Sequence, residues 1–220
     1  MKSIEKQSPA RIIALGFLAV ILTGSFILML PACVKPGVDL HYVDALFTST
    51  SAVCVTGLIA VDTADTFTAI GQTVVALLIQ IGGLGVIACA TVFFLILRRQ
   101  ITVRERVVIQ ETYNMDSLGG MVGMVKRVIT GTFLVEGAGA FLYAFQFVPE
   151  FGLVRGICYS IFHAVSAFCN AGIDILGANS FADYAGNPLI NITTMLLIIL
   201  SGIGFSVWHD VITNGKRIYR

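Results

Sequence analysis

Two segments of the sequence resemble one another and carry residue types suited to binding a small cation. Residues 47–58 align without gaps on residues 162–173, at an offset of 115 residues, and phenylalanine, serine, alanine, cysteine and glycine recur at matching positions. The last of these matches pairs Gly57 with Gly172. Because glycine tolerates a positive φ and close backbone approach, it allows the chain to aim a carbonyl group at an ion.

The stretches around these glycines predict a site for a monovalent cation built from backbone carbonyls. Successive carbonyls of an extended segment can replace the hydration shell of an ion. We call residues 55–58 and 170–173 the first and second filter segments; neither contains a carboxylate, which disfavours calcium. The alternative is that both glycines only cap short buried helices. The candidate ligands are Val55, Thr56, Gly57, Leu58, Asn170, Ala171, Gly172 and Ile173.

The composition indicates an integral membrane protein. Of the 220 residues, 56% are hydrophobic and 12% are charged, whereas about a quarter are charged in soluble domains. The net charge of +1 disfavours a nucleic-acid binder, which needs a basic surface. The five cysteines form no CxxC pair, so neither a disulfide framework nor a transition-metal site is expected.

Apolar stretches of two lengths must position the filter segments. Four are long enough to cross a bilayer, which takes about 20 helical residues: residues 12–30, 71–97, 128–148 and 189–211. Two shorter ones, residues 42–53 and 156–168, end just before the filter segments. As helices these reach only about 20 Å, so we expect them to be re-entrant. Their carbonyl ends, the negative ends of the helix dipoles, would then face a bound cation.

These elements predict an all-α membrane protein with two parallel repeats, arranged as in potassium channels. Each repeat has a transmembrane helix, a re-entrant pore helix, a filter loop and a second transmembrane helix. The repeats cover residues 1–97 and 125–220, joined by a cytoplasmic amphipathic linker at residues 98–124. Taken alone, this linker is most simply an interfacial helix on the lipid bilayer.

The basic residues predict the orientation of the chain. Twelve of the 14 lysines and arginines precede the first long stretch, lie between the second and third, or follow the fourth. Positive residues are retained on the cytoplasmic side, so both termini are expected in the cytoplasm and the chain to be a multi-pass plasma membrane protein. A cleaved signal peptide is disfavoured, because the first stretch of 19 residues exceeds a signal core.

Residues 50–58 (TSAVCVTGL), followed by residues 80–85 (QIGGLG), resemble the pore-forming membrane subunit of the Ktr/Trk/HKT potassium transporters. The resemblance extends to residues 166–172 (SAFCNAG) and is closest to the Ktr branch. It implies potassium transport without an enzymatic reaction or a bound cofactor, and glycine at position 57 implies potassium rather than sodium. Whether sodium is coupled stays open.

The family has four repeats, so the resemblance implies that this chain is the N-terminal half of a pore, truncated or split. A missing second half or a second copy would then complete a filter of four loops. The resemblance also implies a cytosolic nucleotide-binding regulatory subunit as a partner. A non-conducting fragment that assembles with or regulates a full transporter is the alternative.

Several polar residues outside the filter segments need an explanation. Glu136 lies in the third long stretch, and we expect it to accept hydrogen bonds from backbone N–H groups behind the second pore loop; a proton or sodium relay is the alternative. Asp62, Asp65 and Asp174 follow the filter glycines and are either mouth residues that concentrate cations or ordinary loop acids. A membrane enzyme using Glu136 and His163 is disfavoured, because no nucleophile with a paired base is evident.

Overall fold

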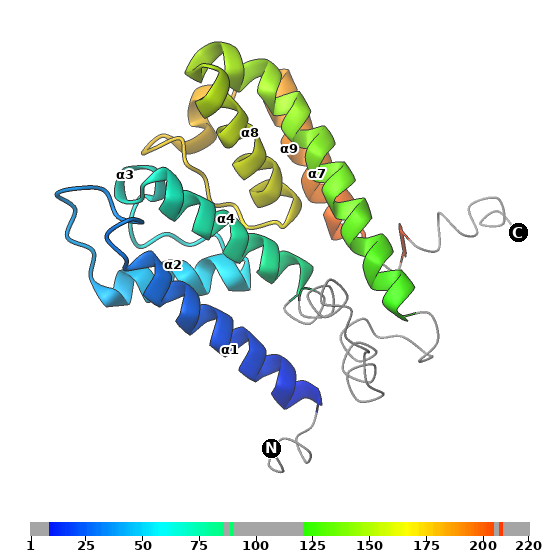
Figure 1. Ribbon diagram of the computed structural model, residues 1–220. Coiled ribbons are helices and arrows are strands. Elements are labelled where there is room, and N and C mark those ends of the chain that lie inside the picture. The colour runs from blue at the N-terminus through cyan, green and yellow to red at the C-terminus, as the bar shows by residue number, and fades with distance from the viewer. Residues whose placement is uncertain (1–8, 86–88, 90–120, 205–206, 209–220) are drawn as a thin grey trace, which may run out of the picture.

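The computed structural model describes residues 9–85, 89, 121–204 and 207–208. Over these ranges the chain is helical, with an isolated bridge between Val34 and Phe67 and no β-strand. Nearly all of the predicted linker, residues 98–124, lies outside the described residues, as does the inner end of the second predicted span. The two halves of the chain lie next to each other, and α4 contacts α8 (Figure 1).

The N-terminal half consists of α1 (Pro9–Leu28), α2 (Tyr42–Cys54), the short α3 (Thr63–Thr66) and α4 (Ala69–Leu84). The central helix α2 packs against both α1 and α4. Two glycines permit this close packing: a Cβ atom at Gly24 would lie 2.6 Å from Ser49 Oγ, and one at Gly82 would lie against the Val53 carbonyl. Ser49 also donates a hydrogen bond of 2.7 Å to the carbonyl of Ile21, which fastens α2 to α1.

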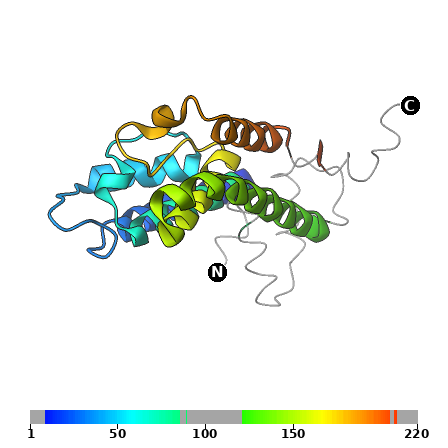
Figure 2. The ribbon, with the colours of Figure 1, turned by 90° about the horizontal axis from the view of Figure 1, so that it is seen from above.

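The C-terminal half consists of α7 (Met121–Phe151), α8 (Leu153–Phe168), the 3₁₀-helix η2 (Ser180–Tyr184) and α9 (Pro188–Gly202). Gly152, with φ of 80°, turns the chain between α7 and α8, which pack as an antiparallel pair. The Asn187 side chain caps α9 by accepting from the backbone N–H groups of Leu189 and Ile190. Both views show α9 running alongside α7 (Figure 2).

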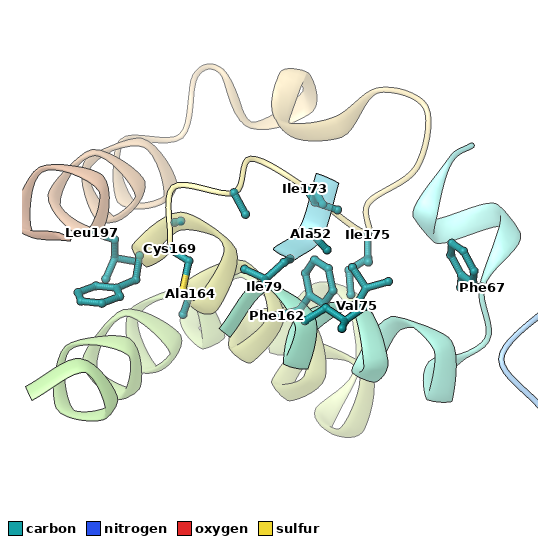
Figure 3. Packing of buried hydrophobic residues seen from close by; sticks show 14 of the residues in the cluster. Ala52, Phe67, Val75, Ile79, Phe162, Ala164, Cys169, Ile173, Ile175 and Leu197 are labelled. Carbon is teal, nitrogen blue, oxygen red and sulfur yellow. The ribbon is translucent and has the colours of Figure 1, made fainter. Parts of the chain in front are cut away.

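The core joins the two halves of the chain. Val75 and Ile79 of α4 gather with Phe162 of α8, and Ile173 and Ile175 from the loop after α8 reach the same cluster (Figure 3). All five side chains are buried. The segment that follows α8 is therefore fixed by apolar packing on the interface between the halves.

Among the described residues, two helices, α1 and α7, are long and apolar enough to cross a membrane. Of the other two predicted spans, residues 71–97 and 189–211, the structure describes α4 as far as Leu84 and α9 as far as Gly202, and their inner parts lie largely outside the described residues. Gly85 and Gly204, with φ of 86° and 88°, follow these ends. A positive φ is incompatible with a right-handed helix, so both helices stop there.

The helices beside the second filter segment are longer than predicted. The third stretch was expected to end at residue 148, whereas α7 continues to Phe151. The short segment was expected to begin at residue 156, whereas α8 begins at Leu153 and has 16 residues. Both observed boundaries differ from the predicted ones because Gly152 alone makes the turn, so the residues on either side of it can be helical.

We expect Gly156→Ala to destabilise the α7–α8 pair. A Cβ atom there would lie 2.5 Å from Val148 Cα and 2.6 Å from the Phe147 carbonyl oxygen, so backbone would have to move. Such overpacking costs about 1–3 kcal/mol, seen as a lower melting temperature of the purified protein. Gly137→Ala in the same helix pair is the control, because no described residue lies within 4 Å of its Cβ position. Equal melting temperatures for the two variants would contradict this packing.

Candidate functional site

The two filter segments begin with the same backbone turn. After α2, Val55 takes a left-handed conformation with φ of 56°, and Thr56 N–H donates to the Ser51 carbonyl at 3.0 Å. After α8, Asn170 has φ of 58°, and Ala171 N–H donates to the Ser166 carbonyl at 2.8 Å. Non-glycine residues seldom adopt a positive φ. The recurrence of this conformation at two positions 115 residues apart therefore indicates that the two turns share the same backbone geometry.

Two residues later in each segment, a glycine also has a positive φ, and there the two segments lie close together. Gly57 has φ of 75° and Gly172 has φ of 69°. A Cβ atom at Gly57 would lie 2.5 Å from the Ala171 carbonyl oxygen, and one at Gly172 would lie 3.9 Å from the Gly57 Cα. The two filter segments are therefore neighbours, and Gly57 leaves the space that the Ala171 carbonyl occupies.

The segments differ in burial. In the first, Leu58 is 63% exposed and Val55 is half-buried. In the second, Ala171 and Ile173 are buried while Asn170 and Gly172 are exposed. The second segment thus buries alternate residues against the protein.

The second segment is also fastened by more side chains. Ser166 Oγ donates a hydrogen bond to the Ile173 carbonyl, and His163 Nε2 accepts one from the Ile175 N–H at 3.4 Å. Asn170 Nδ2 donates to Ser201 Oγ at 2.8 Å, which ties the start of the segment to the end of α9. In the first segment, among the described residues, the side-chain fastening comes from Thr56 Oγ1, which donates to Ser51 Oγ at 3.0 Å and to the Ser51 carbonyl at 3.5 Å. The sequence did not predict these roles for Ser166, Ser201 and Ser51.

The acids proposed for the mouth have local structural partners. Asp62 caps α3 by accepting from the Asp65 N–H at 3.0 Å, and Asp65 is an exposed residue of that helix. Asp174 accepts from the Leu176 N–H and from Ser180 Oγ at 3.0 Å and 2.7 Å. These contacts favour the alternative of ordinary loop acids for Asp62 and Asp174, because both carboxylates shape their own loops.

The expected backbone partners of Glu136 are not found. Glu136 is 4% exposed, yet neither carboxylate oxygen has a hydrogen-bond partner among the described residues. The N–H groups behind the second pore loop are already used: those of Cys169 and Asn170 donate to carbonyls at the end of α8. The side chain beside Glu136 is instead that of Gln80 on α4, whose amide atoms are likewise buried without partners in the described part of the chain. A glutamine deep within an apolar stretch was the sequence signal for this pair.

We predict that Glu136→Gln leaves the melting temperature of the purified protein unchanged or raises it. Neither carboxylate oxygen has a hydrogen-bond partner among the described residues, and a neutral amide beside Gln80 removes the cost of burying a carboxylate. The matched variant Gln80→Glu places a second carboxylate beside the first and should lower the melting temperature. A large loss of stability in Glu136→Gln would contradict the view that the carboxylate charge does not stabilise the fold. Normal folding with altered ion coupling would support the proton or sodium relay.

Comparisons with known proteins bear on the family of this chain. The family model described as TrkH, a cation transport protein, matches residues 5–220. The potassium/sodium uptake protein NtpJ of Enterococcus hirae is 41% identical over 213 residues, which cover 96% of this chain and 47% of NtpJ. The Ktr system potassium uptake protein B of Bacillus subtilis is 41% identical over 210 residues, covering 95% of this chain and 46% of that protein.

The Ktr system potassium uptake protein B of Vibrio alginolyticus is 35% identical over 212 residues, covering 96% of this chain and 46% of that protein. The chain therefore spans about half the length of the curated relatives it matches. The family model covers both filter segments and the helices that position them. On this evidence the chain belongs to the TrkH family of cation transport proteins.

Proposed function

We propose that this chain forms part of a pore that moves potassium across the cell membrane, and that its two filter segments supply backbone carbonyls to the ion. The observation that carries this proposal is the repeated backbone geometry. Positive φ values recur at Val55 and Gly57 in the first segment and at Asn170 and Gly172 in the second, in two segments that are in contact. Three of the relatives are named as potassium or potassium/sodium uptake proteins, which agrees with this function.

The alternating φ values support a carbonyl-lined path. In a regular strand, successive carbonyls point to opposite edges, so only half of them could face one ion. Reversing the sign of φ at every second residue departs from the strand and turns neighbouring carbonyls toward a common side. A potassium ion gives up its hydration shell only where several carbonyl oxygens replace it, so such a geometry is what a filter needs.

The helices before the filter segments support the same function. Each segment directly follows the C-terminus of a short helix, α2 or α8, and helix C-termini carry partial negative charge from unpaired carbonyls. We propose that both are pore helices in two parallel repeats, that the chain crosses the membrane several times, and that both termini are cytoplasmic. Two helix ends aimed at one region would stabilise a cation there.

A filter needs more carbonyls than two segments provide, because the ion must be surrounded. We propose that two further filter segments complete the ring, contributed by the remainder of the transporter or by a second copy of this chain. A cytosolic regulatory subunit is a further proposed partner, as the naming of two relatives as parts of a Ktr system suggests. Sodium coupling is compatible with the relative named for both ions.

We predict that Gly57→Ser lowers the preference for potassium over sodium by about tenfold in the complete transporter. A Cβ atom at Gly57 would collide with the Ala171 carbonyl oxygen and displace a proposed ligand, and the φ of 75° adds strain. Losing about 1.4 kcal/mol of differential binding corresponds to that factor. The measurement is rubidium uptake against sodium uptake in cells without another potassium transporter.

The control for this prediction is Gly177→Ser. Gly177 has φ of 99°, so serine is strained there as well, but nothing lies within 4 Å of its Cβ position and it is outside both filter segments. We expect the control to keep the potassium preference even if it reduces the amount of protein. A full potassium preference in Gly57→Ser, at normal protein levels, would refute the filter.

A further inference from the structure

His163 lies at the centre of an aromatic cluster behind the second filter segment. It belongs to α8 and is 2% exposed. It also lines a cavity of about 180 Å³ together with Asn170 and Gly172 of the filter segment. Ring centroids between 5.0 and 6.5 Å from the imidazole belong to Tyr143, Phe147, Tyr159, Phe162 and Phe181. Such packing leaves the imidazole little freedom to rotate.

Both imidazole nitrogens have backbone partners, and the partners define the tautomer. Nδ1 lies 2.7 Å from the Tyr159 carbonyl oxygen, which can only accept, so Nδ1 carries the hydrogen. Nε2 then holds a lone pair and accepts from the Ile175 N–H at 3.4 Å. One neutral tautomer therefore satisfies both contacts, and it joins α8 to the chain just beyond the filter segment.

The contact from Ile175 is placed to control the shape of the second filter segment. Ser166 Oγ donates to the Ile173 carbonyl, and His163 holds the N–H two residues later. The side chains of Ile173 and Ile175 are themselves buried in the core. The segment is thus fixed along one side of α8 from Ala171 to Ile175, so a shift of Ile175 would be passed to the carbonyls before it.

Among the described residues, the first repeat has no hydrogen bond that corresponds to the one between His163 and Ile175. Thr48 occupies the position that corresponds to His163 at the offset of 115 residues. Thr48 is buried, and its hydroxyl has no hydrogen-bond partner among the described residues. Leu58, the last residue of the first filter segment, and Ile59, which follows it, are 63% and 60% exposed. The two filter segments are therefore held to different degrees by their own helices.

We propose that His163 is a positioning residue for ion selectivity: by accepting the Ile175 N–H, its imidazole fixes the second filter segment at the spacing that favours potassium. This inference rests on the proposed function, because it needs the filter segments to coordinate the ion. His163 does not touch the ion. It acts through the backbone between Gly172 and Ile175, and the imidazole stays neutral because Nε2 must keep its lone pair for this contact.

Two amide substitutions separate the contact with the filter segment from the contact within α8. Asparagine places an NH₂ group near the position of Nδ1 and keeps the bond to the Tyr159 carbonyl, but leaves the Ile175 N–H unpaired. Glutamine reaches the position of Nε2 with an oxygen and keeps an acceptor for Ile175. Both side chains are neutral and of similar polarity, so they differ mainly in which contact survives.

The experiment compares His163→Asn with His163→Gln in the complete transporter, by the ratio of rubidium to sodium uptake per molecule in the membrane. We expect glutamine to keep the ratio within about twofold and asparagine to lower it by about tenfold, as the loss of a buried donor's partner predicts. Thr48→Val, the matched change in the first repeat, should leave the ratio unchanged. Equal ratios for the asparagine and glutamine variants would overturn the proposal.

A second variant covers the case in which His163→Asn does not reach the membrane. Ser166→Ala removes the neighbouring bond to the Ile173 carbonyl and should also lower the ratio, whereas an unchanged ratio would contradict positioning by α8. Different results would refute the proposed filter and the proposed role of His163. If Gly57→Ser keeps the wild-type ratio, the filter itself is wrong; if Gly57→Ser loses selectivity and His163→Asn does not, only the role of His163 is wrong.

Discussion

The proposed function depends on one constraint: an ion that leaves water must find oxygen atoms that replace its hydration shell, and the backbone must be held in an unusual conformation to present them. Positive φ values at Val55 and Asn170 carry a conformational cost that ordinary residues avoid. That cost is offset by the packing of the surrounding helices. Close approach at Gly24 and Gly82, the turn at Gly152 and the core beneath Ile173 all serve to hold the loops after α2 and α8 in place.

The parts that sequence alone predicted are those that repeat. The aligned segments around Gly57 and Gly172 predicted a shared backbone conformation, because a glycine that recurs between repeats in one chain indicates a shared backbone requirement, and both glycines do have a positive φ. The helices before them followed from apolar length. The helix ends at Gly85 and Gly204 were missed, although residues 81–85 resemble residues 200–204, since a glycine within an apolar stretch does not reveal its φ.

Side-chain partners were the least predictable part of the site. The sequence left open whether Asp62 and Asp174 concentrate cations or are ordinary loop acids, and in the structure each accepts hydrogen bonds from its own loop. Glu136 was expected to meet backbone N–H groups, but the end of α8 uses those groups itself, and Gln80 from the other half of the chain lies there instead. Such contacts join residues far apart in the sequence, so no local pattern specifies them.

The most direct test of the account is to locate a heavy alkali cation in crystals of the complete transporter by anomalous scattering from rubidium. We expect rubidium between the carbonyl oxygens of residues 55–58 and 170–173, without side-chain ligands. Rubidium bound at carboxylates such as Glu136 or Asp174, with none between the filter segments, would contradict the claim that these backbone carbonyls bind the transported ion.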